Sequence, residues 1–176
     1  EILRCLVGSE MCIRDRCDGS GRKAEFPSSG KRSTQNSYKM ISHDCKIRVW
    51  YKHTDQMGIC HHSNYICYYE AARSEMLRAL GMSFAEVEKR GIMMPILEVQ
   101  SKYRKPAYYD ELLTVRIILR ELPTTRINFF YEIYNEQGQL INTGMTQLGF
   151  IHSDTRRPCR CPEWYLDLIR AHWTEE

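Results

Sequence analysis

The chain has 176 residues, a formal net charge of +3, 43% hydrophobic residues and eight cysteines. This length favours one domain with a sizeable core over two separate ones. The charge excess lies entirely in residues 1–39, which hold eight basic and five acidic residues, whereas residues 40–176 hold 17 of each. A neutral body gives no electrostatic basis for binding nucleic acid.

The cysteines indicate a reducing compartment. Three of them fall in the first 39 residues, and the five that follow show no repeated CxxC pair. An odd number without metal-ligand spacing predicts free thiols and a cytoplasmic location. No apolar run approaches the roughly 20 residues that a membrane-spanning helix needs, so we expect no stable membrane insertion.

Residues 1–39 differ in composition from the rest. Residues 19–38 are rich in Ser, Gly, Lys and Arg and contain hardly any apolar side chains, which predicts disorder. The opening EILRCLVGSEMCIRDR resembles a translated sequencing-adaptor fragment. We therefore expect Met40 to be the natural start and residues 40–176 to form the functional domain.

The first predicted elements are a strand and a long helix. Residues 46–52 alternate in polarity, with Ile47, Val49 and Tyr51 on one side, which predicts a strand. After residue 62, spacing of three and four predicts a helix of about four to five turns. Ser63 or Asn64 is expected to cap its start, and Gly81 its end.

The two faces of this helix are expected to differ. The apolar face comprises Tyr65, Tyr68, Tyr69, Ala72, Met76, Leu77 and Leu80. The opposite face comprises Glu70, Arg73, Ser74, Glu75 and Arg78. Glu70 and Arg73 lie one turn apart and are expected either to form a structural pair or to touch the ligand.

The remainder alternates in the manner of an antiparallel meander. Residues 83–90 predict a short helix that Ser83 caps and Gly91 ends. Four strands are predicted at 93–103, 111–122, 125–135 and 139–151, followed by a helix at 162–173. One long helix beside one antiparallel sheet predicts an α+β fold in which the sheet curls around the helix.

The segment between the first strand and the long helix concentrates reactive residue types. Asp55, Gly58, His61 and His62 directly precede a helix start, where N–H groups are unpaired and the potential is positive. A glycine permits the tight turn that directs the carboxylate toward that end. This arrangement predicts a reaction site.

A fixed pattern runs through this segment. It reads TDxxGxxxHxxY and comprises Thr54, Asp55, Gly58, His62 and Tyr65, with Glu70 and Arg73 following. Through this pattern, residues 46–151 resemble the hotdog-fold acyl-CoA thioesterases, in the branch of 4-hydroxybenzoyl-CoA thioesterase and the short acyl-CoA thioesterases of bacteria. The resemblance implies a curled antiparallel sheet of about five strands around one helix, and hydrolysis of acyl-CoA without metal or organic cofactor.

The resemblance also implies roles. Asp55 would act as nucleophile or general base, the backbone N–H of His62 would stabilise the oxyanion, and Tyr51 would support the site. Gly58, His61, Asn64 and Tyr65 would contact substrate. A homodimer or homotetramer with sites between subunits is implied as well, and the two exposed edges of a single sheet agree with it.

Other interpretations of these residues stay open at this point. One alternative is a zinc or iron site formed by His53, Asp55, Cys60, His61, His62 and Cys67. Cys60 with His62 would be a thiol nucleophile and its base. A hotdog domain that binds acyl groups without turnover is a third reading. The basic clusters at residues 102–105 and 156–160 are either phosphate contacts or solvated loops.

Overall fold

The computed structural model describes residues 39–175, so the expectation of disorder for the preceding residues lies outside the described part. Its elements in chain order are β1 (Lys39–Arg48), the 3-10 turn η2 (Tyr51–His53), α1 (Asn64–Ala79), α2 (Phe84–Lys89), β2 (Ile92–Met93), β3 (Ile96–Tyr103), β4 (Leu112–Leu119), β5 (Arg126–Tyr134), β6 (Leu140–His152), β7 (Pro158–Cys159), α3 (Glu163–Arg170) and β8 (Thr174–Glu175).

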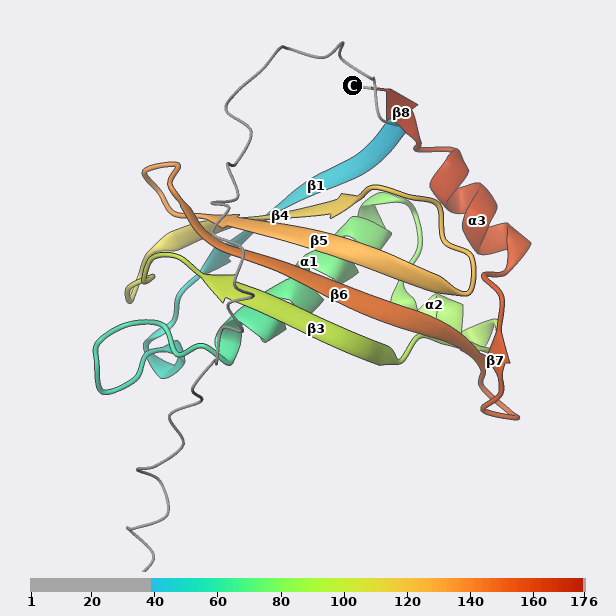
Figure 1. The fold of residues 1–176 in the computed structure, drawn as a ribbon, viewed down its shortest axis with the longest axis horizontal. Coiled ribbons are helices and arrows are strands. Elements are labelled where there is room, and N and C mark those ends of the chain that lie inside the picture. The colour runs from blue at the N-terminus through green and yellow to red at the C-terminus, as the bar shows by residue number, and fades with distance from the viewer. Residues whose placement is uncertain (1–38, 176) are drawn as a thin grey trace, which may run out of the picture. The chain divides into compact units, whose positions relative to one another are not determined.

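Five long strands form one antiparallel sheet in the order β3-β6-β5-β4-β1. The short strands β2 and β7 pair with the end of β6, and β8 pairs with the start of β1. The sheet curls around α1, which crosses its concave side (Figure 1). The predicted α+β architecture is confirmed.

The first strand differs from its prediction. It runs from Lys39 to Arg48 and pairs with β4 along Ile41↔Leu119 to Arg48↔Leu112. The chain then turns into η2, so Tyr51 lies in a 3-10 turn and its assignment to a strand is wrong. The error arose because apolar and polar residues keep alternating beyond Arg48, the last residue that pairs with β4.

Helix α1 buries the predicted apolar face against the sheet. Gly81 adopts a φ of +93° beyond the helix end. Its N–H donates to Arg78 O, and Met82 N–H donates to Leu77 O, which is a Schellman ending and confirms the predicted stop. Ser63 occupies the N-cap position but accepts no capping hydrogen bond, and Asn64 is the first helical residue, so the predicted cap is wrong.

Arg73 was expected on the solvent face, and it is buried instead. Its Nη1 donates to the Tyr131 hydroxyl at 3.4 Å, and its Nε has no hydrogen-bond partner within the described residues. Glu70 is exposed, so the predicted pairing with Arg73 is wrong. Position 73 follows Tyr69 by one turn, which places it on the buried face.

Polar side chains continue from Arg73 through the space between α1 and the sheet. The Tyr131 hydroxyl hydrogen-bonds with Thr146 Oγ1 at 2.8 Å, and the ring of Tyr131 stacks on that of Tyr69 at 4.3 Å. The Tyr69 hydroxyl in turn reaches Ser101 and Asn142. Buried polar groups satisfied in this way fix one arrangement of helix against sheet.

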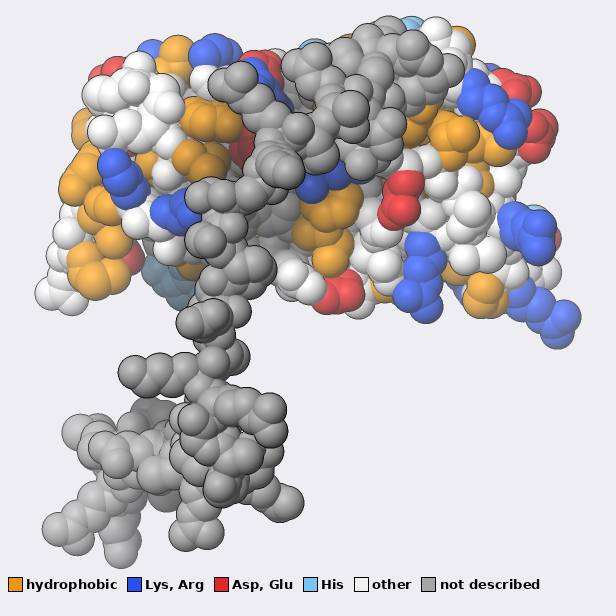
Figure 2. Space-filling view, turned by 45° about the horizontal axis from the view of Figure 1, so that its top comes forward, with side chains coloured by type: hydrophobic (Ala, Val, Ile, Leu, Met, Phe, Trp, Pro, Cys, Tyr) orange, Lys and Arg blue, Asp and Glu red, His pale blue; other side chains and the backbone are white. Residues whose placement is uncertain are grey.

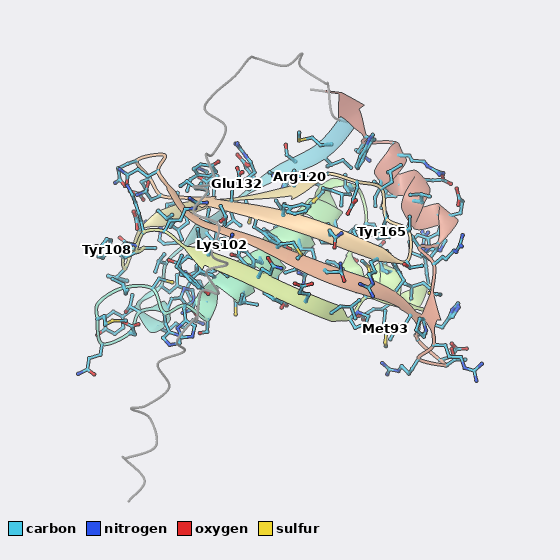
Figure 3. The ribbon with its side chains drawn as sticks, in the orientation of Figure 1. Met93, Lys102, Tyr108, Arg120, Glu132 and Tyr165 are labelled. Atoms are coloured by element: carbon cyan, nitrogen blue, oxygen red, sulfur yellow. The ribbon has the colours of Figure 1, made fainter. Side chains whose placement is uncertain are left out.

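Helices α2 and α3 lie at the same end of the sheet (Figure 1). Ser83 caps α2 through its Oγ, which accepts from Glu86 N–H, and Gly91 follows the helix, as predicted. Tyr165 and Ile169 of α3 are buried against the main core, and Figure 3 shows Tyr165 on the side of α3 that faces the sheet. Where no grey atoms cover it, the face in Figure 2 mixes acidic, basic and apolar side chains.

Candidate active site

Asp55 begins a tight hairpin that projects from one end of the sheet. Thr54 and Cys60 form a β-bridge, Asp55 N–H donates to Ile59 O at 3.0 Å, and Gly58 N–H donates to Asp55 O at 2.9 Å. Gly58 adopts a φ of +73°, which glycine tolerates at little cost. The predicted glycine turn is therefore present.

The Asp55 carboxylate is half-buried and only partly used by this turn. Its Oδ1 accepts the N–H of Met57 at 2.8 Å, whereas Oδ2 accepts no hydrogen bond from the described residues. A carboxylate held through one oxygen has a fixed orientation and one oxygen left for a ligand. Nothing in the turn itself requires this second oxygen.

A hydrogen-bonded latch joins the hairpin to the start of α1. His61 N–H donates to His53 O at 2.8 Å. The side-chain amide of Asn64 donates to the same His53 oxygen at 2.8 Å and to His61 O at 3.2 Å. These bonds hold residues 53 and 61 side by side, so Asp55 and His62 belong to one closed loop.

The N–H groups of residues 61–65 are paired with one exception. Ser63 N–H donates to His61 Nδ1, Asn64 N–H donates to His61 O, and Tyr65 N–H donates to His62 O. The N–H of His62 donates to no acceptor among residues 39–175. An unpaired N–H directly before a helix is the kind of donor that a developing negative charge can use.

Strand β3 supports the helix start from the edge of the sheet. The Tyr103 hydroxyl donates to His62 O at 3.1 Å, and its ring meets that of buried Tyr65 edge to face at 5.1 Å. A cleft of about 360 Å³ opens beside them. Its lining residues are Ile59, Cys60, Tyr65, Tyr103, Arg104, Lys105 and Pro106.

A second polar chain lies beneath the hairpin. The Tyr68 hydroxyl hydrogen-bonds with His53 Nδ1 at 2.9 Å and lies 3.4 Å from the buried Cys60 sulfur. Burial raises the pKa of the Cys60 thiol, and burial lowers the pKa of His53. A protonated, buried thiol is a poor nucleophile, so this geometry disfavours the pairing of Cys60 with His62.

The six candidate metal ligands do not gather into one site, although the rings of His61 and His62 lie 4.1 Å apart. Among the described residues no three His, Cys, Asp or Glu side chains gather as a metal site. The His53 ring is held by Tyr68, the His61 ring bonds to Ser63 Oγ at 2.8 Å, and Cys67 is exposed on α1.

The remaining predicted site residues are placed as follows. Tyr51 lies outside the cleft with 78% of its surface exposed, and its ring contacts Tyr109 edge to face. Its carbonyl accepts from Thr54 N–H and Oγ1, which supports the base of the hairpin. The same end of the molecule carries Tyr108, which bridges to Ile59 (Figure 3). Tyr103 and the His53 carbonyl were missed because both act through contacts distant in sequence.

Comparison with known proteins agrees with this architecture. The family model of the thioesterase-like superfamily matches residues 49–169. A DHNA-CoA thioesterase from Staphylococcus aureus is 35% identical, covers 74% of this chain and 87% of its own, and has a TM-score of 0.69. The acyl-CoA thioester hydrolase YbgC of Escherichia coli is 29% identical over 96 residues, which are 54% of this chain and 72% of that protein.

The fold is shared more widely than the sequence. A solved mutant of 4-hydroxybenzoyl-CoA thioesterase, in complex with 4-hydroxybenzoyl-CoA, has a TM-score of 0.66 at 22% identity and covers 73% of this chain and 98% of its own. The family match spans the hairpin, α1 and all the long strands except β1. The chain therefore belongs to the thioesterase-like superfamily and has its hotdog fold.

Proposed function

We propose that this protein hydrolyses acyl-CoA thioesters to a free carboxylate and coenzyme A. The observation that carries the proposal is the unpaired N–H of His62, which lies on the same closed loop as the free Oδ2 of Asp55. The His62 N–H can bind the carbonyl oxygen, while the Asp55 carboxylate acts as the nucleophile or activates water. The names of similar proteins, which act on CoA thioesters, support the same reaction class.

The reaction needs little more than these two groups. A thioester carbonyl is weakly stabilised by resonance, and its thiolate leaves without a strong acid. Asp55 attacks the carbonyl carbon or removes a proton from the attacking water. Negative charge then develops on the carbonyl oxygen, where the His62 N–H and the positive end of α1 stabilise it. Collapse of this intermediate expels the coenzyme A thiolate. When water was the nucleophile the free acid is formed at this step, and when Asp55 was the nucleophile a water molecule then hydrolyses the mixed anhydride and frees both carboxylates.

The cleft supplies a place for the coenzyme. Arg104 and Lys105 line its mouth beside apolar Ile59 and Pro106. Both cations are exposed and stand next to the loop, where phosphate groups of a nucleotide would find opposite charge. We assign the basic cluster at residues 102–105 to this role, whereas residues 156–160 lie at the other end of the sheet.

Free-thiol release from a panel of acyl-CoA esters tests the function. We expect turnover with at least one short or aromatic ester, in proportion to enzyme and without added metal. Chelator-treated protein should retain its full rate, because Asp55 and His62 need no cation. Binding of the esters without thiol release would contradict hydrolysis and identify an acyl-binding protein instead.

We also propose that the protein acts as a homo-oligomer joined along β3. This strand pairs with β6 on one side and has no strand partner on its other side among the described residues. Its exposed apolar residues are Ile96, Leu97, Val99 and Tyr103, with 44%, 52%, 38% and 49% of their surfaces accessible. An uncovered apolar sheet edge of this kind promotes aggregation unless another chain covers it.

Sedimentation velocity tests this assembly. The wild type is expected to sediment as a dimer or larger, and Val99→Lys as a monomer, because a charge would then lie in the contact. Gln100→Lys is the matched control, since its side chain points to the opposite face of the same strand and bonds to Glu98. A monomeric wild type would contradict the proposal.

No helix in the described part of the chain is long and apolar enough to cross a membrane. The five described cysteines are all free thiols. Free thiols suit the reducing cytoplasm, in which we propose that the protein works.

A further inference from the structure

Arg73 is a buried cation that no acidic side chain neutralises. Only 6% of its surface is exposed, and it forms no ion pair within residues 39–175. Its Nη1 reaches the neutral Tyr131 hydroxyl at 3.4 Å, and its Nε has no hydrogen-bond partner among the same residues. A charge removed from water is costly unless an opposite charge compensates it. The guanidinium therefore keeps one donor and its positive charge available to a ligand.

The Arg73 side chain lines a small cavity at the end of α1 that is distant from the Asp55 hairpin (Figure 1). The walls come from α1, α2, α3, β4 and β5, and they are apolar except for Arg73 and Tyr165. The guanidinium carbon lies 5.8 Å from the centroid of the Phe84 ring, which is one of these walls. The cavity measures about 10 Å³, which is room for about one water-sized particle.

Tyr165 supplies a second donor to this cavity. Its side chain is 2% exposed and lies on the side of α3 that faces the sheet (Figure 3). Its hydroxyl hydrogen-bonds to no other residue in the described part of the chain. Burial raises the pKa of Tyr165, and the positive charge of Arg73 opposes this rise, so the phenol keeps its proton within electrostatic reach of the guanidinium.

From this geometry we infer that Arg73 and Tyr165 bind one monatomic anion, such as chloride, inside the cavity. A water molecule could accept from both donors, but only an anion also compensates the buried positive charge. The cavity volume of about 10 Å³ excludes a phosphate group or a carboxylate that carries a chain, whereas a halide ion is only slightly larger than water. Because the two donors come from α1 and α3, the bound ion joins these helices.

Unfolding in chloride and in gluconate tests this assignment, since gluconate is too large for the cavity. The full chain is unfolded by heat and by urea from zero to about 0.2 M chloride, with gluconate keeping the ionic strength constant. Arg73→Met removes the buried charge, and Tyr165→Phe removes the second donor. Arg78→Met is the matched control, because it removes an exposed cation from the same helix.

Chloride is expected to raise the wild-type melting temperature by at least about 3 °C along a saturating curve. This shift should vanish in Arg73→Met, shrink in Tyr165→Phe and persist in Arg78→Met. In gluconate alone, Arg73→Met should be at least as stable as the wild type, because it buries no uncompensated charge. Equal wild-type stability in the two salts, or a chloride shift that survives in Arg73→Met, would overturn the inference and identify water as the occupant.

Bromide locates the ion independently of any variant and so keeps the inference testable where Arg73→Met does not fold. In crystals of the wild type grown with bromide, we expect an anomalous-scattering peak within hydrogen-bonding reach of Arg73 Nε and the Tyr165 hydroxyl. Bromide peaks confined to surface cations would contradict the assignment. Neither measurement involves thioester hydrolysis, so its outcome is independent of the proposed function.

Discussion

Asp55→Asn is expected to lower kcat by about a hundredfold or more while the protein folds as before, because an amide neither attacks a carbonyl nor accepts a proton from water. The fold should survive because the asparagine Oδ1 can still accept the Met57 N–H that the carboxylate accepts at 2.8 Å. Steady-state thiol release gives the rate, and thermal unfolding monitors the fold.

Asp110→Asn provides the control for this variant. Asp110 is an exposed carboxylate that pairs with Arg48 at 3.3 Å, and an exposed pair of this kind contributes little to stability. The kcat of Asp110→Asn should remain within about twofold of the wild-type value. If Asp55→Asn turned over like the wild type, neither role proposed for Asp55 would hold.

Asn64→Leu is expected to have the second largest effect, on both rate and stability. Leucine is similar in size but donates no hydrogen bond, so the carbonyls of His53 and His61 lose the amide that joins them. Each carbonyl keeps one backbone donor, so the cost is that of the lost side-chain hydrogen bonds, about 0.5–1.5 kcal/mol of unfolding free energy each. The loop would also shift relative to α1, and a displacement of about 1 Å can cost a hundredfold in rate.

Urea denaturation and kcat measurements test this expectation together. Ser63→Ala is the control, because Ser63 precedes Asn64 and bonds to the His61 ring but supplies no cap to α1. We expect its unfolding free energy to change by less than about 0.5 kcal/mol. A stable Asn64→Leu protein with unaltered kcat would show that the latch does not position His62.

The regular elements were predictable because their causes are local. Spacing of three and four defined the buried face of α1, Gly81 and Ser83 marked helix ends, and alternation in polarity found β4, β5 and β6 within a few residues. The turn at Gly58 was predictable for the same reason. Each signal is carried by residues that are neighbours in sequence.

The errors arose where a distant contact overrides the local pattern. Arg73 was placed on the solvent face by its charge, although its position one turn after Tyr69 directs it to the core. Asn64 was expected to cap α1, but its amide is held by the His53 and His61 carbonyls. Tyr103 reaches His62 across 41 positions, and no periodicity indicates such a bond.

Strand β3 combines three tasks within a few residues. Tyr103 bonds to the residue that carries the unpaired N–H, Ser101 anchors the buried Tyr69 of α1, and Val99 lies on the uncovered edge. A mutation in this strand would therefore disturb several traits at once. Substitutions among descendants of this protein should accumulate instead on elements that carry none of these three contacts.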